Sequence, residues 1–257
     1  MGGGLIVWFK TALLEVQEYM RMLGLTARGV VTRPFYYRDV VQQFDAIGVG
    51  SLTVVLLTGT FTGMVLALQS GITLDQFGAR SMVGRLVSAS IVKELGPVLT
   101  GLMVAGRVGS GIAAELGSMM VTDQIAALRA LGTDPIRKLV VPRILAGLLM
   151  VPVLTVIASA VGMVGGWLVS VGVLRVASSV YWNSVVQGLY IQDVWMGLIK
   201  PFFLGFAIVS IGCHVGLRTS GGTQGVGRST TQAVVASSVS VIAVDYFVTQ
   251  LLIVLIY

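Results

Sequence analysis

Three ionisable residues stand inside long apolar stretches of this sequence and are its first candidates for chemistry. Lys93 and Glu94 are adjacent within one stretch, and Asp245 lies near the middle of another. An ionised side chain at the centre of a bilayer costs roughly 2.5–3.5 kcal/mol on insertion scales, so such residues face a cavity or an opposite charge. The sequence therefore indicates either the wall of a substrate cavity or an internal ion pair.

The residues around this pair favour a cavity wall. Pro97 removes a backbone hydrogen bond near Lys93, so the segment is expected to be kinked and partly open. The alternative is an internal ion pair, for which the sequence offers two combinations: Asp245 with Lys93, or Glu94 with Lys200.

Other chemistries are excluded by composition and context. One Cys and one His cannot build a disulfide framework, a Cys/His zinc site or a bis-His haem site. The glycine-rich run from Gly222 to Ser229 is similar to a phosphate-binding loop, but it joins two apolar segments rather than a strand and a helix. We expect it to be a flexible turn. The sequence thus predicts no catalytic residue, no metal site and no cofactor bound by this chain.

The composition places these residues in a membrane protein. Of the 257 residues, 55% are hydrophobic and 11% are charged, whereas soluble domains carry about 25% charged residues. The mean hydropathy is +0.91. So few charges cannot cover a water-soluble surface, which excludes most soluble enzymes and also nucleic-acid binders, despite the net charge of +6.

Five apolar stretches are each long enough to cross a bilayer as a helix, which takes roughly 20 residues. A β-barrel would need short alternating segments instead, so the expected fold is an all-α integral membrane protein. The predicted spans are Ile47–Leu68, Leu86–Gly106, Ile144–Leu174, Val194–Leu217 and Thr231–Ile256.

The segment before the first span predicts an amphipathic helix that lies in the membrane surface. On a helical wheel from Leu5 to Leu23, the polar residues share one arc and the remainder is apolar. The arc holds Lys10, Thr11, Glu15, Gln17, Glu18 and Arg21. Residues 1–45 are therefore expected to form an interfacial helix and a linker, and residues 46–257 a five-span domain. Packing of this helix on a soluble partner is the alternative.

Lysine and arginine predict the orientation. Most of them fall before the first span and in the loops that follow the second and fourth spans. The other two loops hold only Arg80, Arg85 and Arg175. Because cytoplasmic loops carry the excess of positive charge, we expect the N-terminus inside and the C-terminal Tyr257 outside.

The loop between the second and third spans predicts a short cytoplasmic helix. Ala113–Leu131 has a helical composition, Gly132 is a natural stop, and a second short piece, Ile136–Val141, leads into the third span. Such a helix can press into a cleft on a cytoplasmic partner and receive mechanical work. A plain connection between two spans is the alternative.

Six short motifs are distributed along the chain: Gly63-Met-Val-Leu-Ala-Leu-Gln69, Lys93-Glu-Leu-Gly-Pro-Val98, Ala105-Gly-Arg-Val-Gly-Ser-Gly111, Ala114-Glu-Leu-Gly117, Asp134-Pro135 and Val141-Pro142-Arg143. Together they resemble the MlaE/YrbE permease family. Its members are the membrane subunits of ABC systems that move phospholipids or other lipids between the inner and outer membranes of Gram-negative bacteria and their relatives.

The resemblance implies a homodimer with lipid in an outward-facing cavity at the dimer interface. By position, the cavity wall would include Leu66, Leu74 and Phe77 at the end of the first span, and Lys93 and Glu94 on the second. Better-known members have arginine at the position of Lys93. Lysine keeps the charge but loses the planar fork that binds phosphate through two contacts.

The resemblance also implies partners. A dimer of cytoplasmic ABC ATPase subunits, which carry ATP and Mg²⁺, would bind the loop helix at about Val121–Leu131. The residues expected to dock are Thr122, Asp123, Ala127 and Arg129. A STAS-domain protein would accompany the ATPase, and a hexameric ring of MCE-domain protein would sit on the periplasmic face.

The function expected from the resemblance is that of a non-catalytic permease subunit in the bacterial inner membrane. It would move phospholipids between the two membranes and maintain the lipid asymmetry of the outer one. One alternative is an ion- or proton-coupled carrier without an ATPase, with Glu94 and Asp245 as proton sites. Another is a structural anchor for a peripheral complex, in which all three membrane charges would be replaceable.

Overall fold

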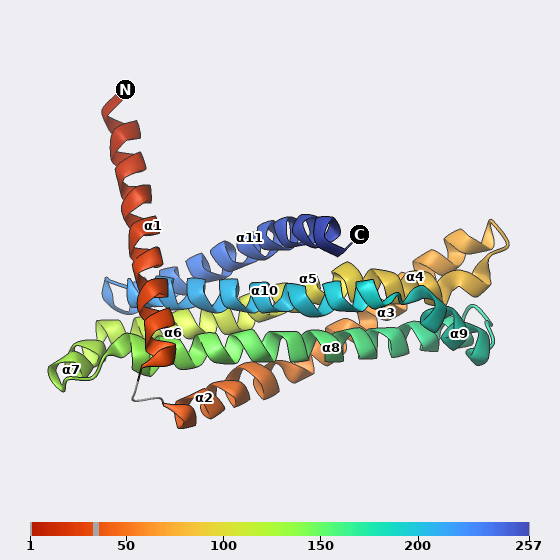
Figure 1. The fold of residues 1–257 in the computed structure, drawn as a ribbon, viewed down its shortest axis with the longest axis horizontal. Coiled ribbons are helices and arrows are strands. Elements are labelled where there is room, and N and C mark those ends of the chain that lie inside the picture. The colour runs from red at the N-terminus through yellow and green to blue at the C-terminus, as the bar shows by residue number, and fades with distance from the viewer. Residues whose placement is uncertain (1, 33–35, 257) are drawn as a thin grey trace.

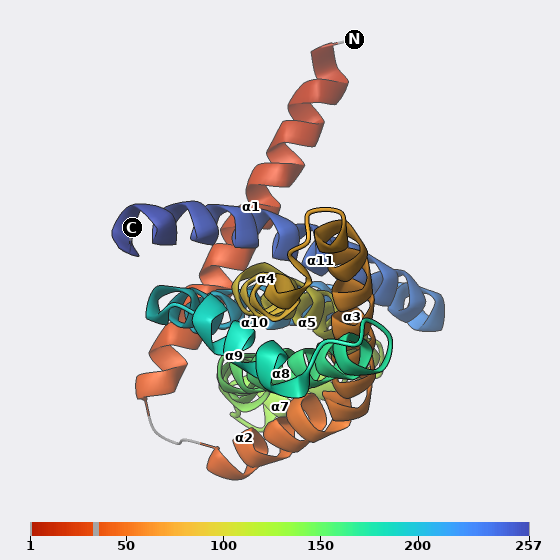
Figure 2. The same cartoon turned by 90° about the vertical axis from the view of Figure 1, so that its right-hand side faces the viewer.

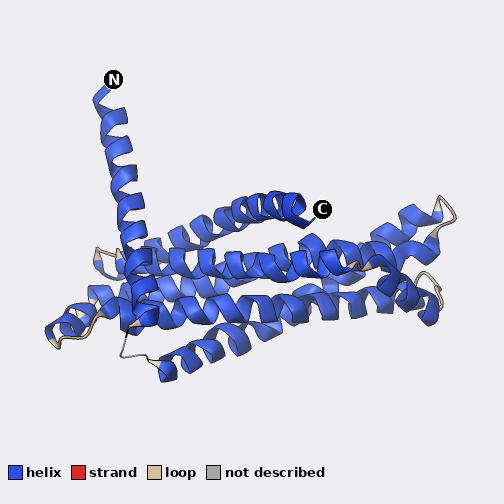
Figure 3. Ribbon diagram, in the orientation of Figure 1, coloured by secondary structure: helices blue, strands red, loops and turns tan. Residues whose placement is uncertain are grey.

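The protein is a bundle of long helices that run side by side (Figure 1). The computed structural model describes residues 2–32 and 36–256, and the regular elements within these ranges are all helical (Figure 3). Five helices in the described ranges are long and apolar enough to cross a membrane: Tyr37–Asp75, Arg80–Val121, Ile136–Gly172, Ile191–Leu217 and Gly222–Leu255. The predicted all-α membrane fold is confirmed.

Three of the spans consist of several helical segments joined end to end. The first contains α2 (Tyr37–Phe44), the π-helical turn η1 (Asp45–Val49) and α3 (Gly50–Asp75). The second contains the 3₁₀ turn η2 (Arg80–Met82), α4 (Val83–Ser90), the π turn η3 (Ile91–Leu95), α5 (Gly96–Val104), the π turn η4 (Ala105–Gly109) and α6 (Ser110–Val121). The third contains the π turn η5 (Ile136–Val140) and α8 (Val141–Gly172). Single π turns interrupt the regular hydrogen bonding, often at functional sites.

The fourth and fifth spans are α10 (Ile191–Leu217) and α11 (Gly222–Ile256). Every span helix begins earlier than the apolar stretch that predicts it. The first turns of α11 contain the glycine-rich run, so the expected flexible turn is wrong. The chain reverses at the start of this run, at Gly221 and Gly222, where φ is +87° and +67°. Glycine adopts such positive values without steric cost.

The loops gather at the two ends of the bundle. One end holds α7 (Gln124–Ala130) and the turn between α10 and α11, whereas α9 (Ser178–Gly188) and the turn between α3 and α4 lie at the other (Figure 1). The loops that are rich in lysine and arginine thus lie at one end of the bundle, and the loops that are poor in them lie at the other. The orientation in the membrane stays a prediction, and the C-terminal Tyr257 lies outside the described residues.

Helix α1 (Gly2–Val31) runs across the long axis of the bundle instead of along it (Figures 1 and 2). It is longer than the predicted helix over Leu5–Leu23. Its polar arc is exposed at Glu15, Gln17, Glu18 and Arg21, and the side chain of Thr11 lies outside the described set. The apolar side chains of Leu13, Val16 and Met20 are also 54–60% exposed. A helix that crosses the spans and leaves apolar side chains uncovered fits the membrane surface, which stays a prediction.

Glycines let α8 approach both α3 and α10 closely. A Cβ on Gly63 of α3 would collide with the backbone of Gly162 on α8, and one on Gly205 of α10 would collide with the backbone of Gly147. Small residues allow this approach in membrane helices, where packing and not the hydrophobic effect holds helices together. The small-residue spacings in these spans therefore serve packing inside one subunit.

We expect Gly63→Ala to destabilise the protein by about 1–3 kcal/mol, because the new methyl group must push α3 away from α8. Gly111→Ala is the matched control, since a Cβ there meets no atom within 4 Å. Thermal unfolding in detergent, followed by size-exclusion chromatography, measures both variants. Equal midpoints for the two would contradict the close α3–α8 contact.

Candidate functional site

Lys200 lies at the centre of a charge cluster between three spans. Its Nζ is 2.7 Å from Oε2 of Glu94 and 3.6 Å from Oδ1 of Asp245. Glu94 belongs to η3, Lys200 to α10 and Asp245 to α11. The Lys200 side chain is fully buried, so one ammonium group, removed from solvent, is shared by two carboxylates.

The irregular backbone of η3 supplies a third contact to this ammonium. Pro97 has no N–H to donate to the carbonyl of Lys93 four residues earlier. Nζ of Lys200 donates a 2.9 Å hydrogen bond to that carbonyl. The loosened turn predicted from Pro97 is thus present as η3, and its carbonyl is satisfied by a side chain from another span.

A second ion pair lies beside the first. Nζ of Lys93 is 2.7 Å from Oδ1 of Asp193, whose side chain is 1% exposed. Asp193 and Lys200 are seven residues apart on α10, which places them on nearly the same face of the helix. This face of α10 therefore presents a carboxylate and an ammonium to the charged turn of the second span.

The structure decides between the two ion pairs that the sequence left open. The pair of Glu94 with Lys200 is confirmed. The pair of Asp245 with Lys93 is wrong, because Asp245 lies beside Lys200 and Lys93 binds Asp193. The side chains of Glu94 and Lys93 remain 44% and 34% exposed. Within the cluster, Lys200 is therefore shielded from solvent, whereas Lys93 and Glu94 of the second span are partly accessible.

Leu66 and Leu74 belong to α3, and Phe77 lies in the turn after it. Leu66 and Leu74 pack against a buried apolar group that includes Val87 and Leu174. Phe77 is 77% exposed in the turn after α3. Lys93 and Glu94 project toward α10 instead, so a single chain does not assemble these five predicted residues into one cavity.

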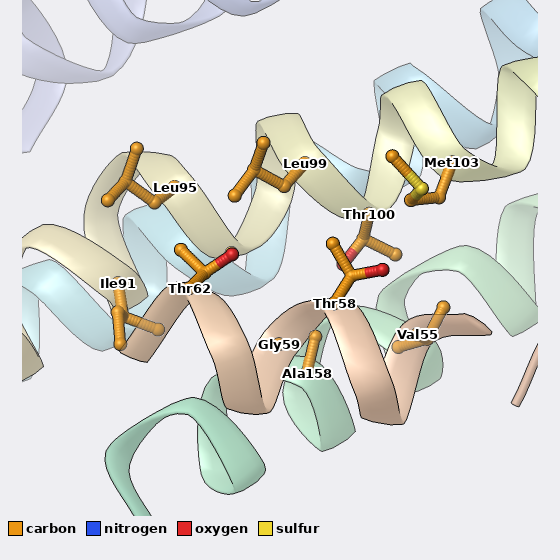
Figure 4. A pocket seen from close by; sticks show the side chains of 11 residues that line it. Val55, Thr58, Gly59, Thr62, Ile91, Leu95, Leu99, Thr100, Met103 and Ala158 are labelled. Carbon is orange, nitrogen blue, oxygen red and sulfur yellow. The ribbon is translucent and has the colours of Figure 1, made fainter. Parts of the chain in front are cut away.

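An apolar slot runs from α3 toward the charged turn. Thr62 of α3 lies across from Leu95 and Leu99, as Figure 4 shows. Thr62 and Leu95 also line a neighbouring groove of about 380 Å³ together with Leu66. Because Leu95 directly follows Glu94, hydrocarbon-compatible surface extends to the turn that carries the exposed carboxylate.

The helix predicted over Ala113–Leu131 is divided in two. Its first part belongs to α6 of the second span, and its second part is the loop helix α7. Ala127 and Arg129 lie on α7 and are exposed. Thr122 follows the last residue of α6, and Asp123 has a φ of +57°. These two docking candidates therefore lie in the turn before the helix, where a positive φ redirects the chain.

A glycine turn ends α7 as predicted. The N–H of Gly132 donates to the carbonyl of Arg129 and the N–H of Thr133 to that of Leu128, each at 3.0 Å, and Gly132 has a φ of +74°. This is the Schellman arrangement for terminating a helix. It leaves Leu131 80% exposed at the tip of the bundle, where an apolar side chain is suited to a partner surface.

Sequence reasoning missed Asp193 and offered Lys200 only as one alternative partner for Glu94. The spacing of seven residues and the proline directly after Lys200 are the signals that could have revealed a charged face on this helix. The partners of that face come from spans distant in sequence, and no local pattern identifies them.

Comparison with known proteins gives one consistent result. The family model described as permease MlaE matches residues 40–251. A probable ABC transporter permease protein of Rickettsia bellii is 45% identical over 86% of both chains. A probable ABC transporter permease protein of Synechocystis is 41% identical over 96% of this chain and 93% of its own. The intermembrane phospholipid transport system permease protein MlaE of Haemophilus influenzae is 35% identical over 96% of this chain and 98% of its own.

We expect Lys200→Met to lower the free energy of unfolding by about 3–5 kcal/mol, since removal of one partner leaves buried charge uncompensated. Adding Asp245→Asn should recover part of this loss, because the two residues belong to one network. Thermal unfolding in detergent gives the comparison, with the exposed Lys10→Met as control. Strict additivity of the Lys200 and Asp245 changes would show that the two side chains are not coupled.

Proposed function

The chain belongs to the MlaE permease family, and from this premise we propose that it is the multi-pass membrane subunit of an ABC transporter for phospholipids in a bacterial inner membrane. Transport between the inner and outer membranes would maintain the lipid asymmetry of the outer one. A separate subunit would bind ATP and Mg²⁺ and hydrolyse the nucleotide. The observation that carries the proposal is the apolar groove lined by Leu66 and Leu95, where Leu95 directly follows the half-exposed Glu94.

The two surfaces match the two parts of a phospholipid. Acyl chains would lie against the apolar surface of α3 that includes Leu66, and the headgroup would lie near Lys93 and Glu94. A homodimer would supply the second wall of this cavity and place Leu74 and Phe77 along it. An exposed apolar face on α3, which includes Leu57, Phe61 and Val65, supports such a wall, because it is available both to a second copy and to lipid.

The ends of the bundle would bind different partners. A cytoplasmic ABC ATPase dimer, accompanied by a STAS-domain protein, would receive α7 with Ala127 and Arg129, and the turn with Thr122 and Asp123. A hexameric MCE-domain protein would sit at the α9 end. The N-terminus would then be cytoplasmic and the C-terminus periplasmic, as the positive charges predict.

Ion pairs tie both sides of α7 to the spans. Arg143, at the start of α8, lies 2.8 Å from Glu115 of α6 through Nη2 and Oε1. Nζ of Lys138 in η5 is 2.5 Å from Oδ2 of Asp39 on α2. A displacement of α7 by the ATPase would therefore pull on the first three spans together. This is the route by which ATP hydrolysis would change the lipid cavity.

A pull-down tests the powered assembly. Full-length chain tagged at the C-terminus and extracted in mild detergent should co-purify with an ATPase subunit in stoichiometric amount. Leu131→Asp should lower the yield of ATPase by about tenfold or more, since a charge replaces an exposed apolar contact, and tenfold corresponds to about 1.4 kcal/mol. Val186→Asp at the other end is the control, because Val186 is 71% exposed on α9.

A chain that purifies alone in several mild detergents would count against the ATP-driven permease. Transport by the purified chain without ATP would instead indicate the ion-coupled carrier.

Reconstituted transport tests the site itself. Glu94→Ala should lower ATP-dependent lipid transfer between vesicles by about tenfold, a loss of about 1.4 kcal/mol, while the ATPase still co-purifies. Asp45→Ala is the control, because Asp45 is an exposed carboxylate in η1. Unchanged transfer by the Glu94 variant would remove this residue from the lipid site.

A further inference from the structure

A second polar cavity lies at the end of the bundle that carries α7. It has a volume of about 450 Å³ and is bordered by α1, by α10 and by the segment from α7 to η5. Three arginines line it: Arg21 on α1, Arg129 on α7 and Arg218 directly after α10. It shares no lining residue with the slot beside Glu94.

Two of these arginines are not neutralised by carboxylates. Arg218 lies 3.6 Å from Glu15 and 3.3 Å from Glu18. Among the described residues, no carboxylate oxygen lies within 4 Å of a guanidinium nitrogen of Arg21 or Arg129. The guanidinium group is a planar fork that matches the geometry of phosphate and carboxylate groups. The cavity therefore offers two available forks for an anion.

Glu18 and His214 also line the cavity, and its other lining residues are apolar. Met22 is 5% exposed at the base of the cavity, and Leu25 and Leu217 also line it. Beside them the rings of Tyr19 and His214 meet edge to face, with 5.3 Å between their centroids. Burial raises the pKa of the Tyr19 hydroxyl, which also lies 2.7 Å from the hydroxyl of Ser210. A cationic rim over an apolar base suits an amphipathic anion.

The face of α1 opposite to the cavity places this helix at the membrane surface. Leu13, Val16 and Met20 follow one another at helical spacing and are 54–60% exposed. A helix with this apolar stripe, crossing the end of the spans (Figure 1), is placed at the level of the headgroups. The cavity therefore lies at the level of the headgroups, and Met22, Leu25 and Leu217 form the apolar surface that it offers to hydrocarbon.

We propose that this cavity binds the phosphate group of an anionic phospholipid from the adjacent leaflet, through Arg21 and Arg129. The bound phosphate bridges α1 and α7, so the lipid fastens the loop helix to the surface helix. This site is distinct from the transport site, and it does not depend on the proposed direction or cargo of transport. A soluble phosphate ester shares the same recognition chemistry, and the experiment separates the two sources.

The test uses the full-length chain, purified without an ATPase and delipidated in neutral detergent. Native mass spectrometry measures the binding of phosphatidylglycerol and of the zwitterionic phosphatidylcholine. We expect phosphatidylglycerol to bind more tightly to the wild type. Arg21→Gln and Arg129→Gln should each weaken this binding about tenfold, as expected for the loss of a hydrogen bond to a charged group. Arg21→Lys should retain part of it.

Arg38→Gln is the matched control, because Arg38 is an exposed arginine on α2 outside the cavity. Arg21 and Arg129 are themselves exposed, so unchanged thermal unfolding midpoints are expected and confirm that each variant is folded. Wild-type binding of phosphatidylglycerol by both cavity variants, or an equal loss in Arg38→Gln, would overturn the proposal.

A competition experiment identifies the source of the phosphate. Inorganic phosphate that displaces phosphatidylglycerol at equal concentration would support the phosphate site but assign it to a soluble ester. Retention of the lipid under these conditions would assign the site to the membrane leaflet. Because no ATPase is present, a failed docking or transport experiment does not affect this result.

Discussion

The burial of one ammonium group between three spans is the constraint on which the central structure depends. Lys200 has no access to solvent, so its charge must be compensated by protein groups. Glu94, Asp245 and the carbonyl of Lys93 provide that compensation from two other spans. The π turn and Pro97 are part of the same arrangement, because they release the carbonyl that the ammonium binds. The buried ammonium of Lys200 and the irregular backbone of η3 thus stabilise each other.

Close packing of the glycine-lined helices holds these groups in place. Lipid gives helices no hydrophobic reason to associate, so the short distance between α3, α8 and α10 must come from small residues and interhelical polar contacts. Gly63 and Gly205 supply the first, and the Lys93–Asp193 and Lys200–Glu94 pairs supply the second. The apolar slot lies next to these contacts, between α3 and the segment from η3 to α5.

Helix α10 connects the two polar regions of the molecule. Near its start it carries Asp193 and Lys200, and at its other end His214 and Arg218 border the cavity beneath α1. A continuous helix transmits displacement better than a loop, so events at the α7 end and at the charge cluster share one stiff element. The ion pairs Glu115–Arg143 and Asp39–Lys138 join the segments on either side of α7 to neighbouring spans. The two polar regions are thereby joined by one helix.

The sequence by itself determined the membrane class, the five spans and the stop at Gly132, and it identified Lys93, Glu94 and Asp245 as charges within apolar stretches. Composition and helical periodicity are local properties, so a single sequence contains them. Only the tertiary structure decided that Asp193 pairs with Lys93 and that Asp245 shares Lys200 with Glu94. It also extended α11 through the glycine-rich run and brought Arg21 beside Arg129. These relations join residues far apart in sequence, and the packing of helix against helix fixes them.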